Sequence, residues 1–256
     1  MLFDSHAHIN DERFDEDRDE VIEHLRENSI DLVVNPGADM PSSRSAVELA
    51  NKVDFIYSAV GVHPHDVETM ADKDLEELKN LAKENEKVVA IGEIGLDYYY
   101  DLSPRELQKE WFIKQIELAN ELGLPFIVHD RDAHGDTFDI IKKYKAPETG
   151  CVLHCYSGSL ELALEYIKMG CYISIPGTVT FKNNRKTVEV AENIPIEWMF
   201  IETDSPYLTP VPYRGKRNDP SKGMYVAEKV AELRGISYEE VCEITKENAK
   251  KFFNIK

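Results

Sequence analysis

The sequence predicts an α/β protein of the (β/α)8 type, a TIM-type barrel with additional helices near its C-terminal end. Eight short apolar runs rich in β-branched residues alternate with amphipathic stretches, which indicates alternating strands and helices. The length of 256 residues is usual for one such barrel. No linker or low-complexity segment divides the chain, so we expect one domain over residues 1–256.

The eight apolar runs are short and almost continuously apolar, which is typical of parallel strands buried on both faces. They cover residues 2–8, 31–37, 55–64, 88–97, 125–130, 151–158, 171–178 and 199–206. An open, doubly wound sheet is the alternative. No G-x-G-x-x-G motif follows the first run, which makes that alternative weaker.

Helical spacing of apolar residues predicts the connecting elements. They cover residues 15–28, 72–85, 103–122, 136–144, 159–169 and 184–193, with two more near 219–233 and 237–253. Asp15 is a candidate cap for the first of these helices. Ser103, followed by Pro104 and Glu106, predicts the start of the third.

The charge balance limits the classes of function. The 30 Lys and Arg residues stand against 48 Asp and Glu residues, which gives a net charge of −18. Such a protein repels a polyanion at long range, which argues against a general nucleic-acid-binding module. It leaves room for an enzyme whose pocket is locally positive because it holds metal ions.

The remaining bulk features favour a cytoplasmic protein. No apolar stretch approaches the roughly 20 residues of a membrane span, and the N-terminus MLFDSHAHIN does not resemble a secretory signal. None of the four cysteines forms a C-x-x-C pair, so we expect reduced, buried thiols. We expect no membrane contact and no obligate protein partner.

Histidines and acidic residues gather at the ends of the predicted strands. Six of the eight histidines lie there, and two acidic residues accompany them: His6, His8, His63, His65, His129, His154, Glu93 and Asp204. In a (β/α)8 barrel the C-terminal strand ends meet on the face that carries the active site. We therefore predict that most of these side chains form one metal site.

The residue types indicate which metals suit the site. In the strand motif His6-Ala7-His8 both imidazoles point to the same side, so they can share one cation. Nitrogen and carboxylate ligands suit Zn, Mn, Fe or Co better than Ca. A carboxylate can bridge two cations, and Glu93 is the expected bridge between one site (His6, His8, Asp204) and a second (His129, His154). Two such ions can hold the attacking and leaving oxygens of a phosphodiester. Asp204 could be a metal ligand, the acceptor of the proton from water, or both.

Other residues are candidates for substrate contact. His63 and His65 could touch the substrate or support the metal ligands, and Glu202 could lie behind the site. Arg131 and the basic segment 214–217, with Arg214 foremost, are candidate phosphate contacts, or else part of a solvated loop. The aromatic run 98–100 could stack on a base or pack the loop. Residues 183–185 could open a helix whose N-terminus favours an anion. We expect His24 to be either a surface or a packing residue of a helix; the role of His134 stays open.

Several blocks of this sequence resemble the signature blocks of the TatD family of metal-dependent deoxyribonucleases. They follow in order from residue 4 to about 219: DSHAHIN, GVHPH, GEIGLDYYYD, VHDRDAHGDT, LHCYSGS and ETDSPYLTPVPYRGKRNDP. The resemblance implies a distorted TIM-type barrel and hydrolysis of DNA phosphodiester bonds, often from the 3′ end. By motif, one metal site matches His6, His8, Glu93 and Asp204, and the other Glu93, His129 and His154. His63 and His65 match a block near the substrate, and Arg131 matches the H-x-R position. Tyr156, where Phe is frequent, and Tyr100 depart from the family pattern outside these ligands.

Together these features predict a deoxyribonuclease that uses two divalent ions, Mg, Mn or Zn, with Glu93 and Asp204 as catalytic carboxylates. DNA is its expected substrate, bound weakly and transiently, and the expected activity is 3′–5′ exonuclease action on single strands. The alternative is a metal-dependent hydrolase of a small ester, amide or lactone. Many relatives of that kind use a carboxylated lysine as the bridge, so a glutamate at position 93 favours the nuclease. A non-enzymatic scaffold protein would lack ligands, and none is missing.

Overall fold

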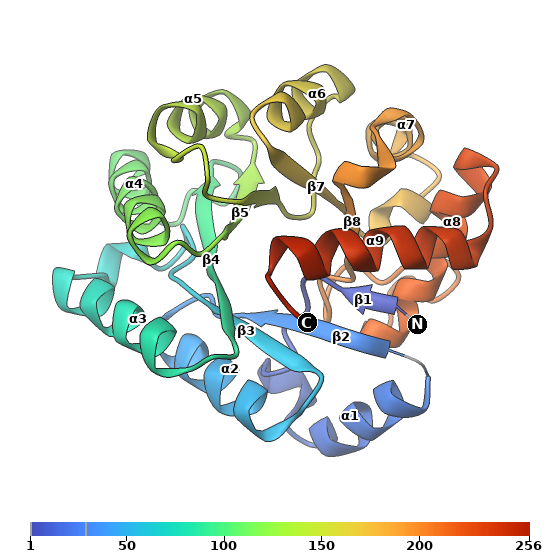
Figure 1. Cartoon of the computed structure of the whole chain (residues 1–256), viewed down its shortest axis with the longest axis horizontal. Coiled ribbons are helices and arrows are strands. Elements are labelled where there is room, and N and C mark those ends of the chain that lie inside the picture. The colour runs from blue at the N-terminus through green and yellow to red at the C-terminus, as the bar shows by residue number, and fades with distance from the viewer. Residues whose placement is uncertain (1, 29) are drawn as a thin grey trace. The chain divides into compact units, whose positions relative to one another are not determined.

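A computed structural model describes residues 2–28 and 30–256. Eight strands alternate with helices, and the strand order is the chain order (Figure 1). The strands are β1 (Leu2–Asp4), β2 (Ile30–Pro36), β3 (Ile56–Val60), β4 (Val88–Asp97), β5 (Phe126–Arg131), β6 (Cys151–Leu153), β7 (Cys171–Ile175) and β8 (Met199–Ile201). All eight predicted strands are confirmed, and with them the (β/α)8 fold class.

Nine α-helices lie in the described part of the chain. They are α1 (Arg18–Glu27), α2 (Met40–Lys52), α3 (Asp72–Glu84), α4 (Arg105–Leu122), α5 (His134–Tyr144), α6 (Leu160–Lys168), α7 (Arg185–Asn193), α8 (Gly223–Arg234) and α9 (Tyr238–Phe252). The two additional helices predicted near the C-terminal end are α8 and α9. None of the described helices is long and apolar enough to cross a membrane.

The chain forms two compact units. The first comprises the N-terminal segment up to Asn35, His154–Ile167 and Tyr172–Lys256; the second comprises Pro36–Leu153 and Lys168–Cys171. In the first unit, β1 pairs in parallel with β2, and β7 with β8. In the second, β3, β4, β5 and β6 pair in that order, all in parallel. The single domain over residues 1–256 stays a prediction.

Aromatic packing anchors the last helix in the first unit. Phe253, which follows α9, lies 6.0 Å from Phe3 of β1 between ring centroids, and Phe252 lies 5.3 Å from Phe200 of β8. Figure 1 shows α9, in red, running beside β1. Phe3 and Phe200 are fully buried, and burying a side chain of this size contributes about 2 kcal/mol. This packing fixes the two strands whose ends carry His6, His8 and Asp204.

Two buried glutamines of α4 hold the loops that leave β3 and β4 in the second unit. The side-chain amide of Gln115 exchanges hydrogen bonds with the backbone N–H (2.8 Å) and carbonyl (3.1 Å) of Val62, next to His63. Gln108 accepts from the backbone N–H of Asp97 (2.9 Å) and donates to the carbonyl of Ser103 (2.7 Å). Buried amides satisfied in this way give the loops a defined position. Helix α4 therefore orients site residues on two different strands.

Three sequence predictions about helices need correction. Helix α2 was not predicted, although Asp39 accepts a hydrogen bond from the backbone N–H of Ser42 (2.7 Å) and caps it. Helix α1 begins after Asp17, so Asp15 is no cap; it pairs instead with Arg18. Helix α4 begins at Arg105, and the Ser103 hydroxyl donates to the carbonyl of His65 (2.9 Å) rather than capping the helix.

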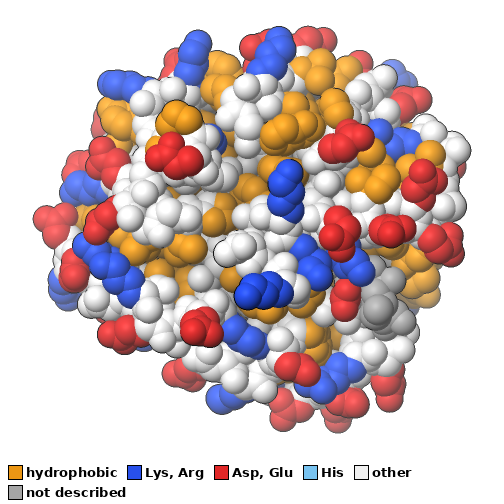
Figure 2. Space-filling model, in the orientation of Figure 1, with side chains coloured by type: hydrophobic (Ala, Val, Ile, Leu, Met, Phe, Trp, Pro, Cys, Tyr) orange, Lys and Arg blue, Asp and Glu red, His pale blue; other side chains and the backbone are white. Residues whose placement is uncertain are grey.

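Charged side chains are scattered over the face drawn in Figure 2, among apolar and uncharged ones. Acidic and basic side chains are interspersed there, so the net charge of −18 does not appear as one continuous acidic field on that face.

Candidate functional site

A cluster of histidines and carboxylates lies in the first unit, after β1, β6 and β8. The Nε2 atoms of His6 and His8 are 3.2 Å apart, and Asp204 Oδ1 lies 3.9 and 3.7 Å from them. The rings of His6 and His154 stack with centroids 3.9 Å apart. Glu202 Oε1 lies 3.4 Å from His154 Nδ1, and one ligand atom each of His6, His154 and Glu202 could reach one ion.

Backbone hydrogen bonds tie the two strand ends that carry this cluster. The backbone N–H of Asp204 donates to the carbonyl of His6 (2.9 Å), and that of His8 donates to the carbonyl of Ser205 (2.8 Å). The buried Asp4 carboxylate accepts from the backbone N–H groups of His6 (3.2 Å) and Thr203 (3.0 Å). Burial raises the pKa of Asp4 to about 7, against the hydrogen bonds from Thr203 and His6, which lower it. Asp4 thus fixes the backbone beside two candidate ligands.

The donor set of this cluster fits a divalent metal. Two imidazole nitrogens that bind one tetrahedral ion at about 2.0–2.1 Å stand about 3.3 Å apart. The separation of 3.2 Å between the Nε2 atoms of His6 and His8 is close to that value. Asp204 adds a carboxylate oxygen on the same side. Nitrogen and oxygen donors of this kind suit Zn or Mn.

A second cluster lies in the second unit, after β3 and on β4 and β5. Glu93 Oε1 lies 2.9 Å from His129 Nδ1 and 3.5 Å from His63 Nε2. Ligand atoms of these three residues lie within 4.8 Å of one another, so they too could hold an ion. Glu93 is only 4% exposed. A buried carboxylate beside two imidazoles is costly unless it is paired, which supports a charged or metal-bound role.

Asp97 is the site residue that the sequence analysis did not single out. One carboxylate oxygen, Oδ2, lies 2.9 Å from His65 Nε2 and 3.0 Å from His129 Nε2. The other, Oδ1, accepts from the backbone N–H groups of Tyr99 (3.0 Å) and Tyr100 (2.8 Å). Burial acts to raise the pKa of Asp97, but the hydrogen bonds from His129, Tyr100 and His65 hold it well below its usual value. Asp97 lies four residues after Glu93 on β4, and both carboxylates contact the ring of His129.

The structure also places the other candidate residues. Glu202 is fully buried, and its Oε1 accepts from the backbone N–H of Cys155 (2.7 Å). Burial acts to raise the pKa of Glu202, and the neighbouring His154 and His6 lower it below its usual value. His134 begins α5, with Nδ1 2.8 Å from Asp130 Oδ2. His24 is exposed on α1, which makes it a surface residue.

The candidate phosphate contacts have different surroundings. The Arg131 guanidinium lies over the rings of Tyr99 and Tyr100, and that of Arg214 lies 4.3 Å from the ring centroid of Phe181. Arg217 instead pairs with Asp17 through Nη1 and Oδ1, which are 2.9 Å apart. This ion pair gives Arg217 a structural role, so Arg214 is the better candidate of the basic segment.

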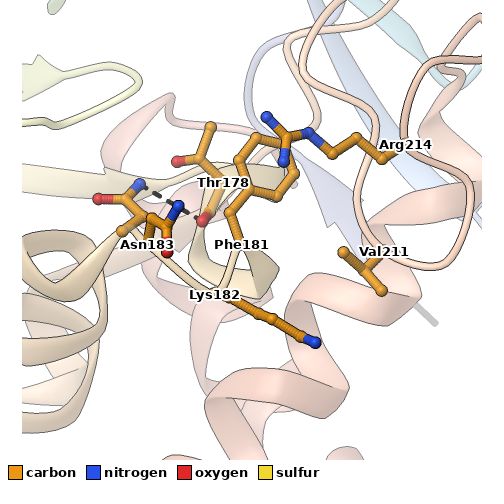
Figure 3. A pocket seen from close by; sticks show the side chains of 7 residues that line it. Thr178, Phe181, Lys182, Asn183, Val211 and Arg214 are labelled. Atoms are coloured by element: carbon orange, nitrogen blue, oxygen red, sulfur yellow. Dashed lines mark hydrogen bonds between the residues drawn. The ribbon is translucent and has the colours of Figure 1, made fainter.

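A pocket of about 560 Å³ lies around Arg214 in the first unit. Figure 3 shows Phe181 with the Arg214 guanidinium against its ring, and the pocket is lined by Thr178, Phe181, Lys182, Asn183, Asn184, Val211 and Arg214. Helix α7 begins at its rim, with Asn184 as the cap, as predicted for residues 183–185. Neither Lys182 nor Arg214 forms an ion pair with a described residue. Two uncompensated cations in a pocket favour an anionic ligand.

Comparisons with known proteins show the family to which the chain belongs. Residues 3–254 match the family described as TatD related DNase. The uncharacterized metal-dependent hydrolase YabD of Bacillus subtilis is 49% identical over 255 residues, covering 100% of both chains. The uncharacterized metal-dependent hydrolase YcfH of Escherichia coli is 38% identical over 258 residues, covering 100% of this chain and 96% of that protein.

Solved structures match over the same length. YjjV, a TatD homolog from Escherichia coli, superposes with a TM-score of 0.94 at 29% identity, over 100% of this chain and 98% of that one. A mutant organophosphorus hydrolase from Deinococcus radiodurans gives a TM-score of 0.63 at 13% identity, over 98% and 92% of the two chains. The second likeness shows the fold alone.

Proposed function

Because the chain belongs to the family of TatD related DNases and is a metal-dependent hydrolase, we propose that it hydrolyses phosphodiester bonds of DNA. The proposed activity is that of a 3′–5′ exonuclease on single-stranded DNA. The observation that carries the proposal is a family match over residues 3–254 in a chain whose histidines and carboxylates form metal-binding clusters.

The proposed ligands are drawn from both clusters. His6, His8, Asp204 and Glu93 are the proposed ligands of one ion, and Glu93, His129 and His154 those of a second. The convergence of His6, His8 and Asp204 supports the first set, and the contact between Glu93 and His129 supports the second. In a (β/α)8 barrel the C-terminal strand ends face one side, which supports a shared role for Glu93. Mg, Mn and Zn are the candidate ions.

Divalent ions bound by these residues supply an acidified water and positive charge for the phosphate. Attack of a water on phosphorus would form one P–O bond and break the bond between phosphorus and the 3′ oxygen, which would take up a proton and leave as a hydroxyl. Asp204 is the proposed acceptor of the proton that water loses, in addition to its role as ligand. Its Oδ1 lies within 4 Å of both His6 and His8, so a water held by these residues is within its reach.

The proposed substrate contacts are His63, His65, Arg131 and Arg214. His63 Nε2 lies 3.5 Å from Glu93 Oε1, and the rings of His63 and His65 are 4.2 Å apart between centroids. Arg214 lines the cationic pocket beside α7. DNA binding is expected to be weak and transient, because the net charge of −18 opposes the approach of a polyanion.

The alternative is a hydrolase of a small ester, amide or lactone. Neighbours such as the organophosphorus hydrolase share the fold, and one fold supports many chemistries. A glutamate at position 93, where such enzymes often carry a carboxylated lysine, favours the nuclease.

The experiment that tests the function is a metal add-back assay. Metal-stripped protein is incubated with single-stranded DNA labelled at the 3′ or the 5′ end, with Mg, Mn or Zn added in turn. The variant Glu93→Ala removes the shared ligand, and Glu86→Ala, an exposed residue just before β4, is the matched control. We expect metal-restored cleavage in wild type and Glu86→Ala, with Glu93→Ala inactive and the 3′ label shortened first.

The same preparation is offered an aryl phosphotriester and a lactone. If protein shown to bind metal hydrolyses either compound while the DNA stays intact, the nuclease proposal is wrong and the chain is a small-molecule hydrolase.

A further inference from the structure

The loop after β4 exposes an unusual amount of apolar surface. Tyr99, Tyr100 and Leu102 are 58%, 54% and 61% exposed, and they are three of the seven large apolar side chains that stand exposed in the described chain. Apolar side chains gathered in one short segment indicate a contact surface, whereas single exposed ones are ordinary. The surface lies directly after the strand that carries Glu93 and Asp97.

Arg131 completes this surface from the neighbouring strand. Its guanidinium carbon lies 4.1 Å from the ring centroid of Tyr99 and 4.7 Å from that of Tyr100. The two rings stand at 85° with centroids 5.0 Å apart. More than half of each tyrosine remains exposed with Arg131 in place, so ring surface stays available to a ligand. We call Tyr99, Tyr100 and Arg131 the aromatic platform.

The platform is held in a fixed position. Asp97 Oδ1 accepts from the backbone N–H groups of both Tyr99 and Tyr100. The backbone N–H of Tyr98 donates to the carbonyl of Arg131 (2.9 Å), and the Tyr98 hydroxyl donates to Asp136 (2.6 Å). A loop anchored in this way loses little conformational freedom when a ligand binds.

The platform adjoins the histidine cluster of the second unit. The ring of Tyr100 meets that of His65 at 90° with centroids 5.5 Å apart. Asp97, which holds the platform through Oδ1, contacts His65 and His129 through Oδ2. One carboxylate therefore sets the distance between the platform and the candidate metal ligands.

We propose that the aromatic platform stacks against an unpaired nucleobase of the nucleotide strand that the enzyme cleaves, an inference that rests on the proposed function. Aromatic faces accept any base, and a guanidinium adds attraction to the base and to its phosphate. In a duplex both faces of a base are covered by its neighbours, so stacking here requires a single strand or a frayed end. The platform thus selects single strands without selecting a sequence.

The test measures stacking separately from cleavage. A single-stranded oligonucleotide with 2-aminopurine at its 3′ end is titrated into the full chain in chelator, and the quenching of its fluorescence gives a Kd. The variants Tyr99→Ala and Tyr100→Ala remove a ring, and Tyr100→Phe keeps it. Met224→Ala is the control, because it truncates an exposed apolar side chain on α8, outside this loop.

We expect wild-type protein to quench the probe, and each alanine variant of a tyrosine to raise Kd by about 5- to 100-fold. Tyr100→Phe and Met224→Ala should stay within about twofold of wild type. The fluorescence of 2-aminopurine placed in the interior of a blunt duplex should not change when protein is added. Quenching that is absent in wild type, or unchanged in both tyrosine-to-alanine variants, overturns the proposal.

Cleavage of the same oligonucleotide after metal is restored separates this inference from the proposed function. If quenching depends on the tyrosine rings but no metal restores cleavage, the stacking proposal is supported and the nuclease proposal is wrong. If wild type and both alanine variants cleave the oligonucleotide with the same KM and quench the probe equally, the nuclease proposal is supported and the stacking proposal is wrong.

Discussion

At the scale of single residues, Asp97 decides how the histidines of the second unit are oriented. Its Oδ2 faces His129 Nε2, which leaves His129 Nδ1 facing Glu93 at 2.9 Å. A carboxylate on the far nitrogen of a histidine ligand fixes the ring and raises its basicity. Asp97 is therefore a positioning residue, and its effect should appear in metal affinity before any substrate is present.

Asp97→Asn tests this role, because it removes the charge and keeps the shape. We expect the affinity of the metal-stripped protein for Zn or Mn to fall by about 10- to 100-fold, as for other carboxylates behind a ligand. Isothermal titration measures it directly. Asp101→Asn, which removes a surface carboxylate paired with Arg105, is the control and should bind metal like wild type. Equal affinities in all three proteins would exclude a positioning role for Asp97.

The sequence predicted the candidate ligands better than it predicted the residues that support them. The sequence indicates His6, His8, Glu93 and His129 as candidate ligands, because imidazoles and carboxylates at the ends of predicted barrel strands are typical of an active site. Asp97 ends the predicted strand 88–97, and its position in the sequence does not indicate a role. Its partner His65 follows β3 and its partner His129 lies on β5, and only the three-dimensional structure shows that both reach it. Gln108 and Gln115 looked like ordinary helix residues for the same reason.

At the scale of elements, the apolar runs predicted every strand. Several of the predicted strands, however, extend beyond the residue at which the observed strand ends. The predicted strand 2–8 ends at Asp4, and 151–158 ends at Leu153. Beyond these points the backbone bonds to irregular partners, such as the Asp4 carboxylate, while the side chains stay buried. Because these side chains are buried, the apolar pattern of the sequence continues beyond the last hydrogen bonds between the strands. Helix α2 was missed because Ser42, Ser43 and Ser45 weaken the apolar pattern at its start.

The pairing of β4 with β5 requires glycine at position 95. Gly95 pairs with His129, has φ +146°, and a Cβ there would stand 2.0 Å from the His129 carbonyl oxygen. Gly95→Ala adds both backbone strain and a clash, each costing about 1–3 kcal/mol. We expect a loss of about 3 kcal/mol in the free energy of unfolding, measured by chemical denaturation. Because His129 must move, metal affinity should fall as well.

Gly123→Ala separates the two effects, because Gly123 also has a positive φ, +65°, but nothing lies within 4 Å of its Cβ position. This control should lose about 1 kcal/mol, the cost of the left-handed conformation alone. If the two variants lose the same free energy, the close approach of β4 and β5 is not what selects glycine at position 95.

At the scale of the whole molecule, the fold is shared much more widely than any substrate. The organophosphorus hydrolase shares it at 13% identity, whereas YabD, a metal-dependent hydrolase by name, matches along its whole length at 49%. Fold alone therefore leaves the reaction open, the relatives indicate metal-dependent hydrolysis, and the clusters of histidine and carboxylate could hold the metal. The substrate must be inferred from the charges and surfaces around those clusters.

The charge distribution makes one such inference testable. With a net charge of −18 the protein repels DNA at long range, so binding depends on local cations such as Arg214. Arg214→Glu should raise KM by about tenfold, the worth of one charge-assisted hydrogen bond, and change kcat much less. It should also reduce the slope of the logarithm of the binding constant against the logarithm of the salt concentration by about 1, the value expected for one lost phosphate contact. Steady-state kinetics on single-stranded DNA at several salt concentrations measure both effects.

Lys52→Glu is the matched control for this charge reversal. Lys52 is exposed at the end of α2, and its reversal lowers the net charge by the same two units, from −18 to −20. If only the overall charge matters, both variants raise KM equally, because long-range repulsion depends on the sum. If the pocket around Arg214 contacts the strand, only Arg214→Glu changes KM and the salt dependence together. An unchanged KM in Arg214→Glu removes that pocket from the path of the substrate.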